Sequence, residues 1–265
     1  HIPSMIEHVE NPVLEIHDLT VSYSKRPVLW NIDLTIPSGV LAGIIGPNGA
    51  GKSTLIKTAM GLIPKASGYV KLFNQDLEAV RKKVSYVPQR ESVDWDFPAS
   101  ALDVVLMGRY GHVGIFKSLR QADKEVAIDC LRKVGMEAFA DRQISQLSGG
   151  QQQRVFLARA LAQDADLYFM DEPFAGVDAA TEKTIIALLK DMTAKGKTII
   201  VVHHDLNSAD EYFDWIILLN TRLVASGPTP LVFTKELLQK TYGGKLNILS
   251  SVGDLLHNEQ FPNRE

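Results

Sequence analysis

The sequence predicts an α/β protein with a mainly parallel sheet and an inserted helical subdomain. Three observations carry this prediction. Short apolar segments alternate with segments of helical periodicity, which is typical of a parallel sheet covered by helices on both faces. One continuous apolar segment leads into a glycine-rich loop, as a buried central strand would. Between about residues 90 and 165 the strand patterns stop and helical periodicity takes over.

Runs of apolar and β-branched residues place the expected strands. Residues 12–45 contain several strands in succession, of which Leu41–Ile45 is the continuous apolar run. A helix is expected from about Lys52 to Met60, because Gly61 and Pro64 would then end it. Further strands are predicted at Gly68–Phe73, Val84–Val87, Leu167–Met170, Thr198–Val202 and Ile216–Leu219.

Helical periodicity and capping patterns predict helix positions. One helix face is marked by apolar residues at the spacing i, i+3, i+4 and i+7, namely Ile185, Leu188, Leu189 and Met192. Gly196 is placed to end this helix as its C′ residue. In the helical subdomain, Ser118 followed three residues later by Gln121 predicts a capping box.

These patterns divide the chain into domains. An α/β core is predicted from residues 5–89 and 166–240, and the helical subdomain from 90–165. The last part, 241–265, is predicted to be a C-terminal tail. Residues 1–4, before Met5, are expected to be a remnant of an expression vector and carry no weight for the fold.

Composition narrows the classes of function. A net charge of -3 and a pI near 6.2 give no basic footprint, so we expect no nucleic acid partner. A single cysteine, Cys130, excludes a disulfide framework and a thiolate metal site. The chain opens without an apolar leader, and its apolar runs are far shorter than the ~20 residues of a membrane helix. A membrane process would therefore require another subunit to cross the bilayer.

A phosphate-binding loop is the strongest motif. The pattern G-x4-G-K-[ST] is met between a predicted buried strand and a predicted helix by Gly46, Pro47, Asn48, Gly49, Ala50, Gly51, Lys52, Ser53 and Thr54. Glycines let successive N–H groups point at phosphate oxygens, and the helix N-terminus adds its positive dipole. Lys52 is expected to bind the β- and γ-phosphates and Ser53 to ligate Mg²⁺. A tight glycine turn would explain the glycines but not Lys-Ser-Thr. The sequence therefore predicts ATP and Mg²⁺ as cofactors.

Two acids follow the predicted strand Leu167–Met170. Asp171 and Glu172 stand at the carboxyl end of that strand, where open α/β sheets bind ligands. Asp171 is expected to reach Mg²⁺ through water, and Glu172 to polarise the attacking water. An exposed Asp-Glu-Pro turn is the alternative. It explains less once a phosphate loop stands about 120 residues upstream.

A third motif, Leu147-Ser148-Gly149-Gly150-Gln151, resembles the signature of the ABC (ATP-binding cassette) ATPases. The phosphate loop, this motif and the acidic strand end occur in that family's order, and the resemblance spans about residues 12–230. It implies a P-loop NTPase core with an N-terminal antiparallel β subdomain and an inserted helical subdomain. Ser-Gly-Gly would also serve as an ordinary helix N-cap. In the family, this helix end binds the nucleotide held by the opposite subunit.

The resemblance implies further site residues. Tyr23 is similar to the aromatic residue that stacks on adenine, although an edge-strand aromatic is an alternative. Gln89 resembles the glutamine that contacts Mg²⁺ and links the core to the helical subdomain. Asp178 ends the segment Ala175-Gly-Val-Asp, where the family has a loop that crosses the dimer interface. Many members have a bulkier sequence before that Asp.

A histidine pair follows the predicted strand Thr198–Val202. A metal site is rejected for this pair, because adjacent residues of an extended segment point to opposite sides. The family places its γ-phosphate-contacting histidine directly before an Asp, which selects His204 and leaves His203 as a packing residue.

The resemblance also implies partners. ATP hydrolysis is expected to require a second copy of the chain in a head-to-tail dimer that encloses two nucleotides. Integral membrane permease subunits, and indirectly an extracytoplasmic metal-binding protein, are the other expected partners. The chain is then a peripheral protein on the cytoplasmic face of the cell membrane.

The cargo is predicted from one segment. Val93–Pro98 and its continuation through Val104–His112 resemble the ATPases of bacterial manganese, zinc and iron importers, with manganese first. This segment lies where the family docks its membrane subunits. A siderophore or cobalamin importer ATPase, or a soluble ABC ATPase without a transport role, remains as an alternative.

Overall fold

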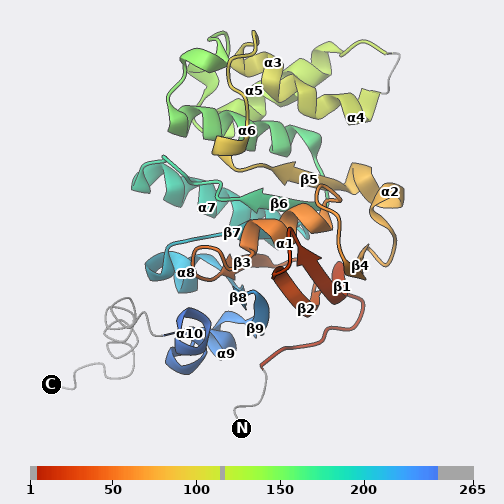
Figure 1. The fold of residues 1–265 in the computed structure, drawn as a ribbon. Coiled ribbons are helices and arrows are strands. Elements are labelled where there is room, and N and C mark those ends of the chain that lie inside the picture. Colours follow the sequence, from red (N-terminus) through yellow and green to blue (C-terminus); the bar gives the residue numbers. More distant parts are fainter. Residues whose placement is uncertain (1–4, 114–116, 244–265) are drawn as a thin grey trace, which may run out of the picture. The chain divides into compact units, whose positions relative to one another are not determined.

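A computed structural model describes residues 5–113 and 117–243. The chain divides into a first unit, which ends at Leu77 and resumes at Val202, and a second unit, Glu78–Val201. Residues 1–4, 114–116 and 244–265 lie outside the described residues, and with them the predictions made for residues 1–4 and for the tail beyond Gly243. Each unit is described by itself below, with the elements labelled as in Figure 1.

The first unit contains an antiparallel three-stranded sheet. Its strands are β1 (Leu14–Ser22), β2 (Pro27–Ile36) and β4 (Ser67–Leu72), in the order β2-β1-β4. Leu14 faces Ile36 on one side and Leu72 on the other, and all three side chains are buried. The N-terminal antiparallel subdomain predicted from the sequence is thereby confirmed.

The remaining strands of the first unit lead to the phosphate loop. Buried strand β3 (Leu41–Ile45) runs parallel to β8 (Trp215–Asn220), which pairs antiparallel with β9 (Arg222–Pro228). The helices of this unit are α1 (Lys52–Ala59), α8 (Leu206–Tyr212), α9 (Thr229–Val232) and α10 (Lys235–Tyr242). At the edge strand β9, the backbone of Ser226 pairs with residues 5–7: Glu7 N–H donates to its carbonyl and its own N–H donates to Met5.

The second unit contains the strands that lead to the acidic motif. Its sheet order is β5 (Val84–Val87), β6 (Leu167–Asp171) and β7 (Thr198–Val202), with β5 parallel to β6. All residues of β6 and β7 are buried, as expected of central strands. Helix α7 (Ala179–Ala194) precedes β7, and Gly196 follows it with φ 96°, which confirms the predicted C′ glycine.

The helical part of the second unit packs on α6 (Gly149–Gln163), against which α3 (Ala101–Leu106) and α5 (Gln121–Lys133) lie (Figure 1). Short segments complete it: α2 (Leu77–Val80) and α4 (Tyr110–Val113), with 3₁₀ turns between the longer helices. A mainly parallel α/β fold with an inserted helical region is therefore confirmed.

The predicted capping box of Ser118 and Gln121 is wrong. Helix α5 begins at Gln121, and its N-cap is Arg120, whose backbone N–H donates to Asp123 at 2.9 Å. The carboxylate of Asp123 is the better acceptor at N3, so the helix starts two residues later than the Ser118 pattern requires.

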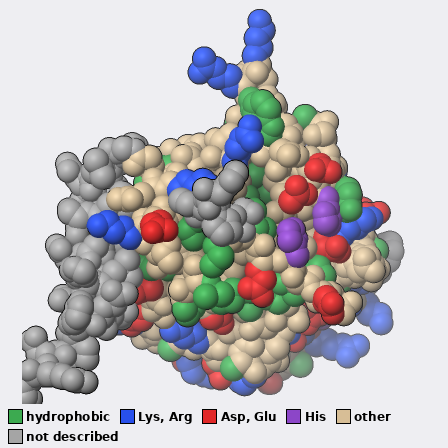
Figure 2. Space-filling view, turned by 90° about the horizontal axis from the view of Figure 1, so that it is seen from below, with side chains coloured by type: hydrophobic (Ala, Val, Ile, Leu, Met, Phe, Trp, Pro, Cys, Tyr) green, Lys and Arg blue, Asp and Glu red, His purple; other side chains and the backbone are tan. Residues whose placement is uncertain are grey.

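Helix composition and surface charge both bear on the class of protein. Within the described ranges, no helix has the length and apolar character needed to span a bilayer. On the face shown in Figure 2, lysine and arginine side chains are scattered among acidic ones and do not form a continuous stripe.

Candidate nucleotide site

The phosphate loop connects β3 to α1 in the first unit. Gly49 and Gly51 have φ values of 79° and 95°, a left-handed conformation that favours glycine. A Cβ at Gly46 would lie 2.0 Å from the carbonyl oxygen of Leu219, so the loop passes against β8 without room for a side chain. The tip at Asn48 and Gly49 is exposed. Backbone N–H groups at this turn and the start of α1 form a cradle of the kind that binds phosphate.

Lys52 folds back over its own loop. Its Nζ donates to the carbonyl oxygens of Gly46 at 2.6 Å and Pro47 at 3.0 Å, and the side chain is only 8% exposed. The cation is therefore held above the loop by acceptors that phosphate oxygens could replace. Ser53, the next residue, is half-buried in the first turn of α1.

Two more predicted site residues belong to the first unit: Tyr23, which lies near this loop, and His204, which follows β7. Tyr23 comes directly after β1, is 63% exposed, and its hydroxyl lies 3.4 Å from the Thr54 hydroxyl. The exposed ring next to the phosphate loop offers a flat apolar face. His203 and His204 have different environments, since His203 is buried against Tyr212 while His204 is exposed. His203 thus packs in the core, as the sequence analysis expects.

The acidic strand end lies in the second unit. Asp171 closes β6 and is fully buried. Burial, with a smaller contribution from the negative charge of Asp171, raises the pKa of Tyr86 on the neighbouring strand to about 12. Glu172 follows with φ 49°, a left-handed conformation that is uncommon for a side chain of this size. Asp171 is buried whereas Glu172 is half-buried, so the two neighbouring acids have different environments.

Gln89 forms a hydrogen bond with Glu172. Its Nε2 donates to Oε2 of Glu172 at 2.9 Å, although 83 residues separate them in the sequence. Gln89 follows β5 and Glu172 follows β6, so the parallel pairing of these strands brings the two side chains to the same sheet edge. The structure thus joins two residues that the sequence predicted as separate members of one site.

The signature residues form the N-terminus of α6. Ser148 is the N-cap: its Oγ accepts from Gln151 N–H at 3.3 Å, and its N–H donates to Gln151 Oε1 at 2.9 Å. Gly150 packs against the loop after Glu172, since a Cβ there would lie 2.3 Å from the carbonyl oxygen of Gly176. Ordinary capping and an exposed anion-binding helix end are both compatible with this geometry.

Asp178 is the N-cap of α7. Its carboxylate accepts from the Thr181 hydroxyl at 2.6 Å and from Thr181 N–H at 3.0 Å, and these hydrogen bonds lower its pKa. Asp178 is exposed at the end of the Ala175–Asp178 loop. Helix capping is therefore one role that this residue fills within its own chain.

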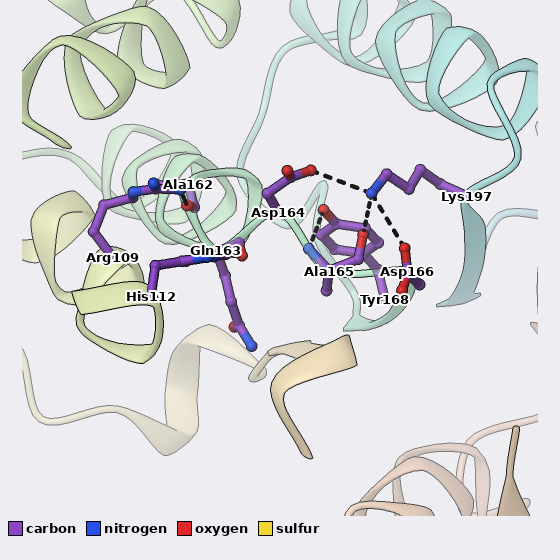
Figure 3. Close-up of polar contacts among 9 residues, drawn as sticks. All are labelled: Arg109, His112, Ala162, Gln163, Asp164, Ala165, Asp166, Tyr168 and Lys197. Atoms are coloured by element: carbon purple, nitrogen blue, oxygen red, sulfur yellow. Dashed lines mark hydrogen bonds and ion pairs between the residues drawn. The ribbon is translucent and has the colours of Figure 1, made fainter. Parts of the chain in front are cut away.

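The other end of α6 is also anchored, as Figure 3 shows. Arg109 donates to the carbonyl of Ala162 at 2.9 Å, and His112 Nε2 hydrogen-bonds the carbonyl of Gln163. Beyond the helix, Lys197 donates to the carbonyl of Ala165 at 2.6 Å and pairs with Asp164. Cations at a helix C-terminus are favourable. Helix α6 is held at both ends.

Some contacts around the signature helix have no sequence signal. Arg90 donates through both Nε and Nη2 to Oε1 of Gln152, 62 residues away. The Trp95 ring packs on Phe156 at 4.6 Å. Neither pair lies at a motif spacing. Arg90 directly follows Gln89, and Trp95 lies six residues after Gln89.

With this geometry described, comparison with known proteins defines the class. Residues 29–175 match the ABC transporter family, so the chain belongs to that family. Its enzymatic activity is ATP hydrolysis.

Individual relatives are similar over most of their length. The chain is 63% identical to the manganese transport system ATP-binding protein MntB of Bacillus subtilis (strain 168), over 89% of this chain and 94% of that protein. It is 57% identical to the zinc transport system ATP-binding protein TroB of Treponema pallidum (strain Nichols), over 88% of each. A solved dimeric ATP-binding cassette, in a post-hydrolysis state with ADP and Pi bound, matches with a TM-score of 0.71 and 30% identity, over 81% of this chain and 98% of that chain.

Proposed function

We propose that this chain is the ATP-hydrolysing subunit of an importer that moves a divalent metal ion, manganese in the first place, through separate permease subunits. The observation that carries the cargo is the 63% identity to an ATP-binding protein of a manganese transport system over nearly the whole chain. The proposal of ATP hydrolysis is supported by the phosphate loop, the Gln89–Glu172 hydrogen bond and the N-terminus of the signature helix α6.

Within this proposal, Lys52 leaves the carbonyls of Gly46 and Pro47 and binds the β- and γ-phosphates instead. Tyr23 stacks on adenine through its exposed ring. His204 holds the γ-phosphate. Such contacts are catalytic to the extent that they are stronger in the transition state than in the ground state.

The oxygen donors present fit Mg²⁺. Ser53 offers a hydroxyl, Gln89 an amide oxygen and Asp171 a carboxylate, the ligand types that this ion takes in proteins. Asp171 is fully buried, and an ionised carboxylate in such a position would be stabilised by a nearby cation. When bound, Mg²⁺ would neutralise charge on the phosphates. Glu172 would orient and polarise the attacking water.

A second copy of the chain would complete each site. The exposed N-terminus of α6, with Ser148, Gly149, Gly150 and Gln151, would bind the nucleotide held by the phosphate loop of the other copy, and Asp178 would lie at the interface. Dimer closure then depends on ATP, and hydrolysis releases it.

The domain scheme and location belong to the same proposal. We propose an ATP-binding core from 5–89 and 166–240 and a helical subdomain from 90–165, which would dock the permease at the cytoplasmic face of the membrane. An extracytoplasmic metal-binding protein would deliver the cargo to that permease.

Metal uptake tests the proposal. We expect cells lacking their own system to accumulate manganese above zinc and iron when they express this chain with its permease and binding protein. The variant Lys52→Ala should reduce uptake to background, because the phosphates lose their cation. Element analysis of washed cells gives the readout. Uptake of a siderophore or cobalamin, or no uptake by any wild-type assembly, would contradict metal import.

A further inference from the structure

The position of the catalytic carboxylate depends on a chain of contacts that begins at the signature helix. Glu172 is held by Gln89, whose Nε2 donates to it at 2.9 Å. Gln89 is the residue that precedes a short 3₁₀ turn, Arg90–Ser92. Contacts that hold this turn in place therefore also limit the position of the Gln89 side-chain amide.

Arg90 fixes the turn to α6. Its Nε and Nη2 lie 3.1 and 3.0 Å from Oε1 of Gln152, and its guanidinium carbon would be 3.0 Å from a Cβ at Gly149. Gln152 is itself immobilised, since it is 4% exposed and its Nε2 donates to the carbonyl of Ile144 at 3.1 Å. The arginine thus joins the loop after β5 to the first turns of the signature helix.

Trp95 provides a second attachment along the same helix face. Its ring packs edge-on against Phe156, and its Nε1 donates to the carbonyl of Arg90 at 3.0 Å. Gln152 and Phe156 are four residues apart, so they lie on one face of α6. Residues 90–95 are therefore attached to α6 at two points, through Arg90 and through Trp95.

The same helix end contacts the loop that follows Glu172. Gly150 packs against the carbonyl of Gly176, in the loop that begins at Glu172. The backbone N–H of Ala175 closes that loop by donating to the Glu172 carbonyl at 3.2 Å. The N-terminal part of α6 therefore contacts the loop that follows Glu172, and it is connected to the Glu172 side chain through Arg90 and Gln89.

We propose that Arg90 is a positioning residue for ATP hydrolysis, which acts through Gln152 on one side and Gln89 on the other to orient the carboxylate of Glu172. The inference rests on the proposed role of Glu172 as the group that polarises water. Arg90 touches neither nucleotide nor water in this scheme. It makes the position of Gln89 depend on the position of the signature helix.

The test is a double-mutant cycle on steady-state ATP hydrolysis by the full chain assembled with its permease. We expect Arg90→Met to lower kcat about tenfold, with the KM for ATP changing less than twofold, because a displaced carboxylate loses orientation and not substrate binding. Gln152→Leu should have the same effect. In a Gln89→Ala background, Arg90→Met should change kcat by less than twofold.

A matched control separates positioning from folding. Arg132 also makes a two-pronged contact, to Glu137, but on the exposed face of α5, so Arg132→Met should leave kcat and KM unchanged. The proposal is overturned if Arg90→Met lowers kcat by the same factor with and without Gln89, or if it raises KM instead. The role of Glu172 is checked separately: wild-type turnover by Glu172→Gln refutes the proposed function, whereas additivity in the cycle refutes only the role of Arg90.

Discussion

At the scale of single residues, the histidine pair after β7 shows how neighbours in sequence acquire different chemistry. His203 is 3% exposed, its Nε2 lies 2.9 Å from the Ser208 hydroxyl, and its ring packs against Phe213. Burial, with a smaller contribution from His204, lowers its pKa from 6.5 to about 4. His203 is therefore neutral in the folded chain at physiological pH.

This lowered pKa predicts a loss of stability in acid. The unfolded chain binds a proton at His203 near pH 6.5 and the folded chain only near pH 4. The contribution of His203 to the free energy of unfolding should therefore be fully present above pH 6.5. It should fall by roughly 3 kcal/mol as the pH drops toward 4.

His203→Gln keeps a polar partner for Ser208 without a titrating ring. We expect urea unfolding of this variant to depend less steeply on pH between 7 and 5 than that of the wild type, whereas exposed His8→Gln should match the wild type. Equal slopes for wild type and His203→Gln would show that His203 does not titrate in this window.

At the scale of elements, the anchoring of α6 at both ends is the main feature. Arg109 contacts the last turn of α6 through the carbonyl of Ala162 and pairs with Asp123 at the start of α5, at 3.0 Å. Hydrogen bonds from the Arg120 backbone N–H and from the Arg109 side chain lower the pKa of Asp123. One side chain therefore joins the ends of two helices.

Removing this connection should lower stability. We expect Arg109→Met to reduce the unfolding temperature by on the order of 5 °C, since charged hydrogen bonds at two helix ends are lost together. Lys124→Met, on the exposed side of α5, should change it by less than 1 °C on the same scale. Thermal unfolding followed by circular dichroism gives both values. Equal unfolding temperatures for the two variants would mean that the Arg109 contacts carry no net stability.

The elements also show what sequence reasoning can reach. Strands β3, β6 and β7 were predictable because they are continuous apolar runs next to motifs, and the phosphate loop because its spacing is chemically constrained. Edge strand β9 and helix α10 were not predicted, since neither carries a motif. The start of α5 was predicted wrongly because two capping patterns overlap there.

The candidate site divides in the same way. Residue types such as Lys52 and Glu172 follow from the chemistry of phosphate transfer. The Gln89–Glu172 and Arg90–Gln152 contacts arise only when distant segments pack, so no local pattern encodes them. The left-handed backbone of Glu172 likewise depends on the loop that follows it.

At the scale of the whole molecule, the exposed signature end is the feature that concerns assembly. Ser148 is exposed and its capping partner Gln151 is half-buried, so the N-terminus of α6 is accessible to an anion from another copy. The solved relative with ADP and Pi is dimeric. ATP binding and dimer formation should therefore be linked in this chain.

A size measurement tests this linkage. We expect Glu172→Gln with ATP to run as a dimer in light scattering, because it binds but does not hydrolyse nucleotide. Adding Ser148→Arg should return it to monomer with nucleotide affinity changed less than about twofold, since the blocked helix end serves the partner's nucleotide. Ser118→Arg, at an exposed serine outside the motif, should leave the dimer intact. A monomer that hydrolyses ATP at full rate would contradict the linkage.

The pairing of residues 5–7 with Ser226 has a consequence for specificity of association. An unpaired edge strand can form backbone hydrogen bonds with an extended segment of another chain, and repeated pairing of this kind leads to aggregation. Here residues 5–7 pair with the backbone of Ser226 in the middle of β9. An extended peptide from another protein is therefore hindered from pairing with β9 at this position.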